Sequence, residues 1–332
     1  MNLTVFKRLH SEGLISDTSL ERVRIVEEKR LFSVHWELKT LLYLGVVMLS
    51  GGLGILVYKN IETIGHQTIL LFIALVCGGC FYYCLHKAGD FSRYRAAAPD
   101  PFFDYILLLG CLSFLTFIGY LQFEYTFFGS DYRLATFIPM VVLFISAYYF
   151  DHMGVLSLAI TNLAAWVGIS VTPLRILREN DFHDHGLIYT GLALGVVLLM
   201  AGVASERRNF KKHFEFTYEN FGTHILFISG LAGLFTFDGV YLGWFLLFAG
   251  VAAYFYREAL KRRSFYFLLV DILYTYVALS YVVVRLLMKS SIATNDFVWF
   301  LYLGFFYFVL SAIGVVRLLI ILNRKMRVYD SL

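Results

Sequence analysis

Residues 264–288 read SFYFLLVDILYTYVALSYVVVRLLM, and this stretch decides how the chain is interpreted. It is long and apolar enough to cross a bilayer, yet it contains an acid, Asp271, and a base, Arg285. Steps of three and four residues place five side chains on one stripe of a helix: Asp271, Tyr274, Ala278, Tyr281 and Arg285. A charge inside a membrane is costly and usually faces a protein interior or a water-filled cavity, so the stripe is the best pointer to function.

The composition assigns the whole chain to the membrane class. Of its 332 residues, 59% are hydrophobic and 16% are charged, whereas a soluble domain contains about 25% charged residues. The basic residues stand at the ends of apolar segments rather than on one soluble face, so we expect no nucleic-acid partner. All four cysteines lie in apolar stretches, which argues against a disulfide framework.

Ten apolar segments approach the ~20 residues that a membrane-crossing helix needs. They are Leu38–Tyr58, Gln67–Leu85, Phe103–Leu121, Leu134–Phe150, Val155–Val171, Gly186–Ala204, Thr223–Phe237, Val240–Tyr256, Phe265–Leu287 and Phe297–Leu322. The seventh and eighth are short and are separated only by Asp238–Gly239, so they form either a tight hairpin or a re-entrant pair. The predicted fold class is all-α, a polytopic transmembrane helix bundle of about ten spans.

The distribution of Lys and Arg predicts the orientation in the membrane, because cytoplasmic loops collect these residues. Placing the N-terminus inside leaves only five bases outside: Lys59, Arg133, Arg175, Arg178 and Lys289. The remaining bases near span ends then all lie inside, including those of the loop 205–222. We therefore expect both termini in the cytoplasm.

The chain divides into three parts. Residues 1–36 predict a small cytosolic helical hairpin, in which Gly13 ends the first helix and either Ser16 or Thr18 caps the second, Thr18 together with Glu21 as a capping box. Residues 37–323 form the transmembrane bundle, and residues 324–332 form a cytosolic tail. Two short helices bury little surface, so we expect the hairpin to lean on the bundle or on a partner.

The N-terminal part resembles a known family. The matching features are LHSEGLIS at 9–16, a charged helix through Arg30, Trp36-Glu-Leu, and the glycine-rich LGVVMLSGGLG at 44–54. The family consists of bacterial predicted membrane proteins of unknown function, and the resemblance covers roughly the first 70 residues. It implies a multi-pass protein of the bacterial cytoplasmic (inner) membrane. The family supplies no catalytic or ligand residues to carry over.

Asp271 is the centre of the predicted binding site. We expect its carboxylate to pair with Arg317 of the last span and to accept a hydrogen bond from Tyr274, with Tyr281 on the same stripe. Two interpretations stay open, a structural lock between helices and an ion or proton site, since buried pairs are often structural. We expect Arg285 to reach lipid headgroups or Asp296, and Asn162 to find a partner inside the bundle.

Two clusters carry metal-ligand residue types. Cys77, Cys80 and Cys84 share a helical face, which favours small, polarisable packing over a metal site because structural zinc takes four ligands. Asp181, His183 and His185 stand in an outer loop as weak candidates for a divalent cation, but nothing outside completes their ligand set. We therefore expect no metal and no cofactor.

Small residues at a spacing of four predict close helix contacts, within one chain or in a homodimer. Gly191 with Gly195 forms such a motif, and Ser50 with Gly54 has the same spacing.

The sequence contains no nucleophile–base pair, phosphate-binding loop or dinucleotide fingerprint, so we expect the protein not to be an enzyme. One hypothesis is a transporter or permease of a small solute or ion that uses the stripe on the ninth span. The alternative is a membrane scaffold or regulator that docks a partner through its N-terminal hairpin and basic loops. The expected partners are membrane lipids, a second copy of the chain or another membrane protein.

Overall fold

The structure, a computed structural model, describes residues 6, 9–21, 35–96, 98–129, 132–171, 185–289 and 297–330. Within these residues the chain forms helices and turns, without a strand. The described residues form ten long helices in chain order: α3 (His35–Ile64), α4 (His66–Lys87), α5 (Phe103–Tyr125), α6 (Arg133–Phe150), α7 (Met153–Val171), α8 (His185–Arg207), α9 (Glu215–Thr236), α10 (Tyr241–Lys261), α11 (Phe265–Lys289) and α13 (Phe297–Asp330).

Each predicted span lies within one of these helices and extends past its end by at most one residue, although several helices are longer than predicted, so the all-α fold class is confirmed. Eight of the described helices are long and apolar enough to cross a membrane, and α7 adds a shorter apolar stretch, Met153–Gly168. The remaining helix, α9, has a polar first half that carries Glu215, Glu219 and Asn220. The seventh and eighth spans are two full helices, α9 and α10, joined by the short 3-10 turn η3 (Asp238–Val240).

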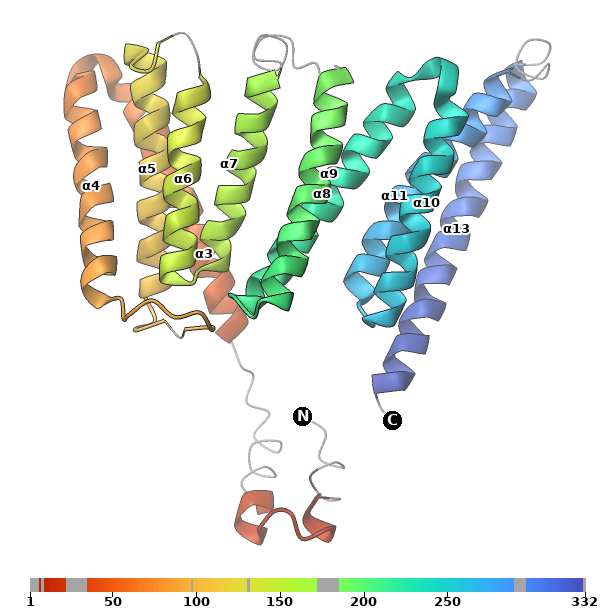
Figure 1. Ribbon diagram of the computed structural model, residues 1–332, viewed down its shortest axis with the longest axis horizontal. Helices are drawn as coiled ribbons and strands as arrows, with labels where there is room; N and C mark the ends of the chain where they lie inside the picture. The colour runs from red at the N-terminus through yellow and green to blue at the C-terminus, as the bar shows by residue number, and fades with distance from the viewer. Residues whose placement is uncertain are drawn as a thin grey trace.

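Successive helices run in opposite directions, so their connections gather at two ends of the bundle (Figure 1). One end, called the basic face below, carries the connections after α4, α6, α8 and α10, the start of α3 and the end of α13. Exposed bases gather there: Lys87, Arg93, Arg95, Arg207, Arg208, Lys212, Lys261, Arg262, Arg263 and Arg324. The other end, called the opposite face, carries the connections after α3, α5 and α9.

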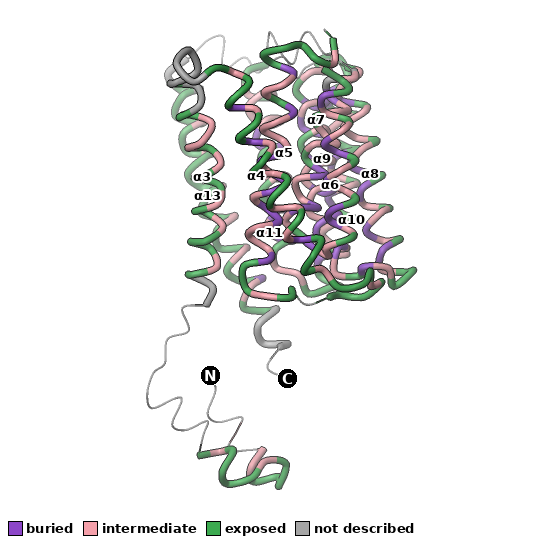
Figure 2. Tube along the Cα trace, turned by 90° about the vertical axis from the view of Figure 1, so that its left-hand side faces the viewer, coloured by how far each residue is buried: buried purple, intermediate pink, exposed green. Residues whose placement is uncertain are grey.

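Helices that are neighbours in sequence pack most closely: α4 with α5, α6 with α7, α8 with α9, and α10 with α11. A buried cluster that includes Leu107, Leu143, Leu156 and Phe214 joins α4–α9, and a second joins α9, α10 and α11. The first and last long helices, α3 and α13, are largely exposed along their length (Figure 2). In a membrane, lipid would cover these exposed apolar surfaces.

The glycine motif on α8 makes a close helix contact inside the chain. A Cβ atom at Gly195 would lie 3.0 Å from the backbone nitrogen of Leu226 and 3.1 Å from the carbonyl oxygen of Gly222 on α9. Only a residue without a side chain allows the two backbones to approach so closely. The close contact predicted from Gly191 and Gly195 is therefore confirmed, and the partner is α9.

Some predicted features lie outside the described residues. Most of the second helix of the hairpin at 1–36 falls there, although residues 9–11 and 17–21 are helical and Gly13 has a left-handed φ of 70°. Asp181, His183 and Asp296 also lie outside, so the contacts predicted for them stay predictions.

Candidate functional site

Asp271 is buried where α11 packs against its neighbours. Its residue is 3% exposed, and its Oδ1 atom has no hydrogen-bond partner among the described residues. One turn earlier Leu268 is fully buried, and the adjacent Ile272 is also buried. The sequence therefore identified a carboxylate that lies inside the protein rather than in lipid.

The predicted ion pair between Asp271 and Arg317 is wrong. α13 packs on α11 through Val315, Leu319 and Leu322, which recur at helical spacing. Arg317 lies two residues beyond Val315, a rotation of about 200° on a helix with 3.6 residues per turn, and its side chain is exposed. It therefore points away from Asp271.

Tyr274 does not bind Asp271 but takes part in a chain of hydrogen bonds between α9 and α11. Its hydroxyl lies 2.9 Å from His224 Nδ1, and His224 Nε2 lies 3.2 Å from the hydroxyl of Tyr266. Tyr266 in turn donates to Asn220 Oδ1 at 2.6 Å. We call these four residues the α9–α11 relay.

When His224 is neutral, each hydrogen bond of the relay has a defined donor and acceptor. Because Tyr266 gives its proton to Asn220, its oxygen accepts from His224 Nε2–H, and Nδ1 is left to accept from Tyr274. The chain thus runs from Tyr274, one turn from Asp271, to Tyr266 and Asn220 nearer the basic face. The outer member, Tyr266, is 39% exposed.

Sequence reasoning missed the α9 half of this relay, because it treated the seventh span as simply apolar. The signal was present: Asn220 and His224 are four residues apart and therefore share one face of a helix. Tyr266 and Tyr274, eight residues apart on α11, share a face in the same way.

A small cavity of about 120 Å³ opens near the relay, between α8, α9, α10 and the start of α11. Its polar lining comes from Glu219, Thr223, Glu258, Arg262 and Ser264. Thr223 is 1% exposed, and its hydroxyl has no partner among the described residues. The cavity therefore has an unpaired hydroxyl and two carboxylates in its lining. It lies near the basic face, beside the start of α11, the helix that carries Asp271.

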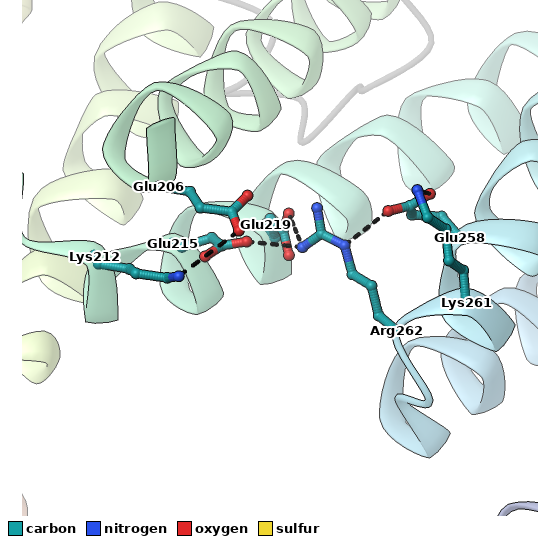
Figure 3. A network of polar contacts seen from close by, with 7 residues as sticks. All are labelled: Glu206, Lys212, Glu215, Glu219, Glu258, Lys261 and Arg262. Atoms are coloured by element: carbon teal, nitrogen blue, oxygen red, sulfur yellow. Dashed lines mark hydrogen bonds and ion pairs between the residues drawn. The ribbon is translucent and has the colours of Figure 1, made fainter. Parts of the chain in front are cut away.

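Arg262 organises the carboxylates around this cavity (Figure 3). Its Nη1 atom lies 2.8 Å from one oxygen of Glu215 and 2.8 Å from one of Glu219, and its Nε donates to Glu258 at 2.8 Å. Three acids share one guanidinium that is 35% exposed, with Lys261 at 4.0 Å from Glu258. Acids outnumber bases within this group, which favours cations over anions at the cavity.

The other end of the stripe forms an ion pair near the opposite face. Arg285 Nη2 lies 2.6 Å from Asp238 Oδ1, and Nη1 donates to the hydroxyl of Tyr281 at 2.6 Å. The guanidinium also lies 4.4 Å from the ring centroid of Tyr241. Arg285 thus contacts the turn between α9 and α10, a partner that the sequence did not predict.

The remaining predicted site residues do not join this arrangement. Asn162 is partly buried on α7, and its side chain makes no hydrogen bond within the described part of the chain. His185 is exposed at the start of α8, with its ring 4.5 Å from that of Phe237. The described residues contain no group of three His, Cys, Asp or Glu side chains that could hold a metal ion. Cys84 lies in the buried core, and Cys77 contacts the carbonyl oxygen of Gly110 at 3.7 Å.

A second polar cluster, called the basic-face lock below, consists of Asp151, Lys211 and His213. Lys211 Nζ and His213 Nε2 each lie 2.8 Å from Asp151 Oδ1, and Ala96 N–H donates to Asp151 Oδ2 at 2.6 Å. The side chains of Asp151 and Lys211 are 2% and 1% exposed. The cluster joins three connections of the basic face, because the amide of Lys211 also donates to the carbonyl oxygen of Arg93.

Burial lowers the pKa of His213, although the neighbouring carboxylate of Asp151 opposes this shift. His213 is therefore neutral at pH 7, and Lys211 supplies the positive charge that Asp151 needs. The adjacent His152 caps α7 by accepting a hydrogen bond from Val155 N–H at 3.0 Å, and burial lowers its pKa as well. Asp151 and His152 thus hold the turn between α6 and α7 and tie it to the neighbouring connections, which is a structural role.

Comparison with known proteins matches residues 7–156 to a family described as "Predicted membrane protein (DUF2157)". Comparisons with curated proteins and with solved structures found no match. The match begins in the N-terminal segment and extends into α7, beyond the features of the first 70 residues. It ends before α9 and α11, so it does not include Asp271 or the relay. Over residues 7–156, the family resemblance is confirmed, and this part of the chain has the sequence of a predicted membrane protein of unknown function.

Proposed function

We propose that this membrane protein is a transporter or permease of a small solute or ion, with Asp271 as its ion-binding carboxylate. The observation that supports it most is the unsatisfied state of Asp271, which is buried without an ionic or hydrogen-bond partner among the described residues. An ionised carboxylate in such a place is costly, so it takes up a proton or a cation. A group that served only as a lock would have its partner in place.

The surroundings of Asp271 favour a cation that arrives from the basic face. The relay links Tyr274, one turn away on α11, to Tyr266 near that face through neighbouring hydrogen bonds. The cavity beside it contains more acidic than basic groups. Chains of hydroxyl and imidazole groups move protons between water and buried acids, so a proton is the ion that this arrangement fits best.

The proposed orientation places the basic face in the cytoplasm of a bacterial cell, with the protein in the inner membrane. The excess of exposed Lys and Arg on that face supports this orientation through the positive-inside rule. The start of α3 and the end of α13 then both lie on the cytoplasmic side. The alternative, a membrane scaffold or regulator that docks a partner through the hairpin at 1–36 and the basic loops, stays a hypothesis.

Transport assays on purified protein in proteoliposomes test the proposal directly. A solid-supported membrane records charge movement when a pH gradient is imposed, first alone and then with panels of small solutes. We expect a current in the wild-type protein and its loss in Asp271→Asn, because the amide cannot exchange a proton. Asp90→Asn makes the same chemical change at an exposed position of the basic face and should leave the current unchanged.

Size-exclusion profiles and unfolding temperatures must show that Asp271→Asn is folded. A folded Asp271→Asn protein with the wild-type current would refute the role of Asp271. Tyr274→Phe provides a second measurement, because it removes the hydroxyl that binds His224 while keeping the ring that stacks on Phe227. It should slow the current without abolishing solute binding.

A further inference from the structure

A second, larger cavity lies far from Asp271 in the sequence, between α3, α4 and α5. Its volume is about 330 Å³, at the lower end of the roughly 300–1,000 Å³ typical of small-molecule sites. Most of its lining is apolar, with Leu53, Phe72, Ile73, Val76 and Phe123 among the contributing side chains. Polar groups are concentrated at one end, where His66, Tyr120 and Glu124 come together.

The cavity exists because α3 presents small residues to its neighbours. Ser50 and Gly54 were expected to make a close helix contact, but they line the cavity instead. A Cβ atom at Gly54 would meet no atom within 4 Å. The glycine-rich segment therefore opens a space beside α4 and α5 rather than closing one.

The length and position of the cavity match one leaflet of a bilayer. Along α5 it extends from Ser113 to Glu124, eleven steps of the helix or roughly 16 Å. The hydrocarbon core of a bilayer is about 30 Å thick, so half of it is close to this length. Ser113 stands at the middle of α5, and Glu124 stands at its end on the opposite face. The apolar part thus lies at the depth of lipid chains, with the polar end at the depth of head groups.

The polar contacts at this end determine which head group fits. Tyr120 O–H lies 2.6 Å from His66 Nδ1, and His66 Nε2 lies 3.3 Å from Glu124 Oε1. With Nδ1 accepting from the hydroxyl of Tyr120, the ring proton of His66 lies on Nε2, which faces Glu124 at the distance of an ion pair. The donors of this group are thereby used, and what it offers to a ligand is the remaining acceptor capacity and negative charge of Glu124.

We propose that this cavity binds one hydrocarbon chain of a membrane lipid whose head group carries a primary ammonium, which Glu124 recognises. The apolar lining accepts the chain along one leaflet, and the ammonium donates to the carboxylate at the opposite face. The volume suits one chain, so the second chain of the lipid stays in the bilayer. The site is independent of Asp271 and of transport.

Native mass spectrometry of the full-length protein tests the site with defined lipids. The protein is purified in mild detergent, delipidated, and incubated with equal amounts of phosphatidylethanolamine and phosphatidylglycerol that carry the same chains. We expect the wild-type protein to retain the ethanolamine lipid at least about tenfold more than the glycerol lipid, a difference that an added ion pair supplies at a partly buried site.

Substitutions at Gly54 and Glu124 test the binding of the hydrocarbon chain and the recognition of the head group separately. Gly54→Leu fills the cavity and should reduce the retained lipid about tenfold, while Gly45→Leu makes the same change at an exposed position of α3 outside the cavity. Glu124→Gln should keep lipid binding but lose the preference for the ammonium head group.

The proposal is overturned if the wild-type protein retains both lipids equally, or if Gly54→Leu and Gly45→Leu retain the same amount. The comparison of the two lipids on wild-type protein needs no variant, so it stays decisive even if Gly54→Leu fails to fold. A loss of transport in Asp271→Asn would not affect it.

Discussion

At the scale of single residues, the buried charges divide into those with partners and those without. Asp151 has two cationic or hydrogen-bonding side chains and a backbone amide around it, whereas Asp271 has none among the described residues. Lys211 adopts a left-handed φ of 51°, which costs roughly 1–2 kcal/mol in a residue with a side chain. The left-handed backbone and the buried ammonium are both costs, so the contacts of the basic-face lock hold Lys211 in place.

Breaking the basic-face lock from the acidic side should be costly. Asp151→Asn leaves the buried ammonium of Lys211 without a counter-charge, and removing one partner of a buried pair typically costs about 3–5 kcal/mol. Unfolding monitored in detergent should show this loss. The double variant Asp151→Asn with Lys211→Met should recover part of it, because the lone charge is gone. A loss no larger than that of Asp90→Asn would contradict the role of the lock.

The lock should also make stability depend on pH. The pKa of His213 is lowered in the folded protein from its usual 6.5, so the unfolded state binds its proton more readily. Folding stability from this group is complete above about pH 6.5 and declines as the pH falls below it, by at most about 1.4 kcal/mol per pH unit.

Unfolding temperatures measured from about pH 7.5 to about pH 5.5 test this pH dependence. His213→Gln should show a shallower decline than the wild-type protein over this range. His152 has a lowered pKa too, so part of the decline should persist in the variant. Equal slopes in the two proteins would exclude His213 as a contributor.

The sequence predicted which acid would be buried but not what surrounds it. Asp271 could be identified because it is the only acid within the largely apolar stretch 264–288, whose one base is Arg285. Arg317 was a wrong partner because the rotation of α13 depends on which of its apolar faces packs, and nearly all of its faces are apolar. The same uniformity explains why the partner of Tyr274 could not be chosen from the sequence.

At the scale of helices, hydropathy predicted where each helix lies in the sequence better than where it begins and ends. An apolar run marks every long helix of the described residues, although those of α7 and α9 are short, and a helix continues beyond the membrane wherever polar residues keep its hydrogen bonds. The clearest case is α9, which begins at Glu215, eight residues before the predicted start at Thr223. Those two additional turns carry Glu219 and Asn220, so the error in the boundary concealed part of the candidate site.

The contact between α8 and α9 should be sensitive to added volume. In Gly195→Leu the new side chain would meet backbone atoms of Leu226 and Gly222, which cannot rotate away. Overpacking of this kind typically costs about 1–3 kcal/mol. Gly243→Leu on α10 is the matched control, because a Cβ there meets nothing within 4 Å. Thermal unfolding in detergent should rank the control close to the wild-type protein, and the opposite ranking would contradict the close contact.

At the scale of the whole molecule, the two faces give the proposed orientation a simple test. A membrane-impermeant maleimide added to intact cells should label Phe127→Cys, which is exposed on the opposite face. It should not label Lys212→Cys on the basic face until the membrane is opened. The native cysteines lie within α4 and α5, so they should contribute little background. Labelling of Lys212→Cys in intact cells would invert the orientation.

The number of helices and their alternation followed from the sequence, because each membrane crossing needs its own apolar run. Their lateral arrangement did not follow, since lipid-facing and protein-facing surfaces are equally apolar here. The cavity beside α3 belongs to this second class of features. It depends on three helices meeting around Gly54, and only the assembled bundle shows that space remains there.

The close packing of α4 with α5, α6 with α7, α8 with α9 and α10 with α11 has a consequence for biogenesis. Contacts between adjacent helices close only short loops, so they form early and at low entropic cost. As the nascent chain leaves the ribosome, α4 can associate with α5 before α6 is made, and the later pairs can follow in the same order. The molecule is thus suited to being inserted two helices at a time, with α13 added last against α11.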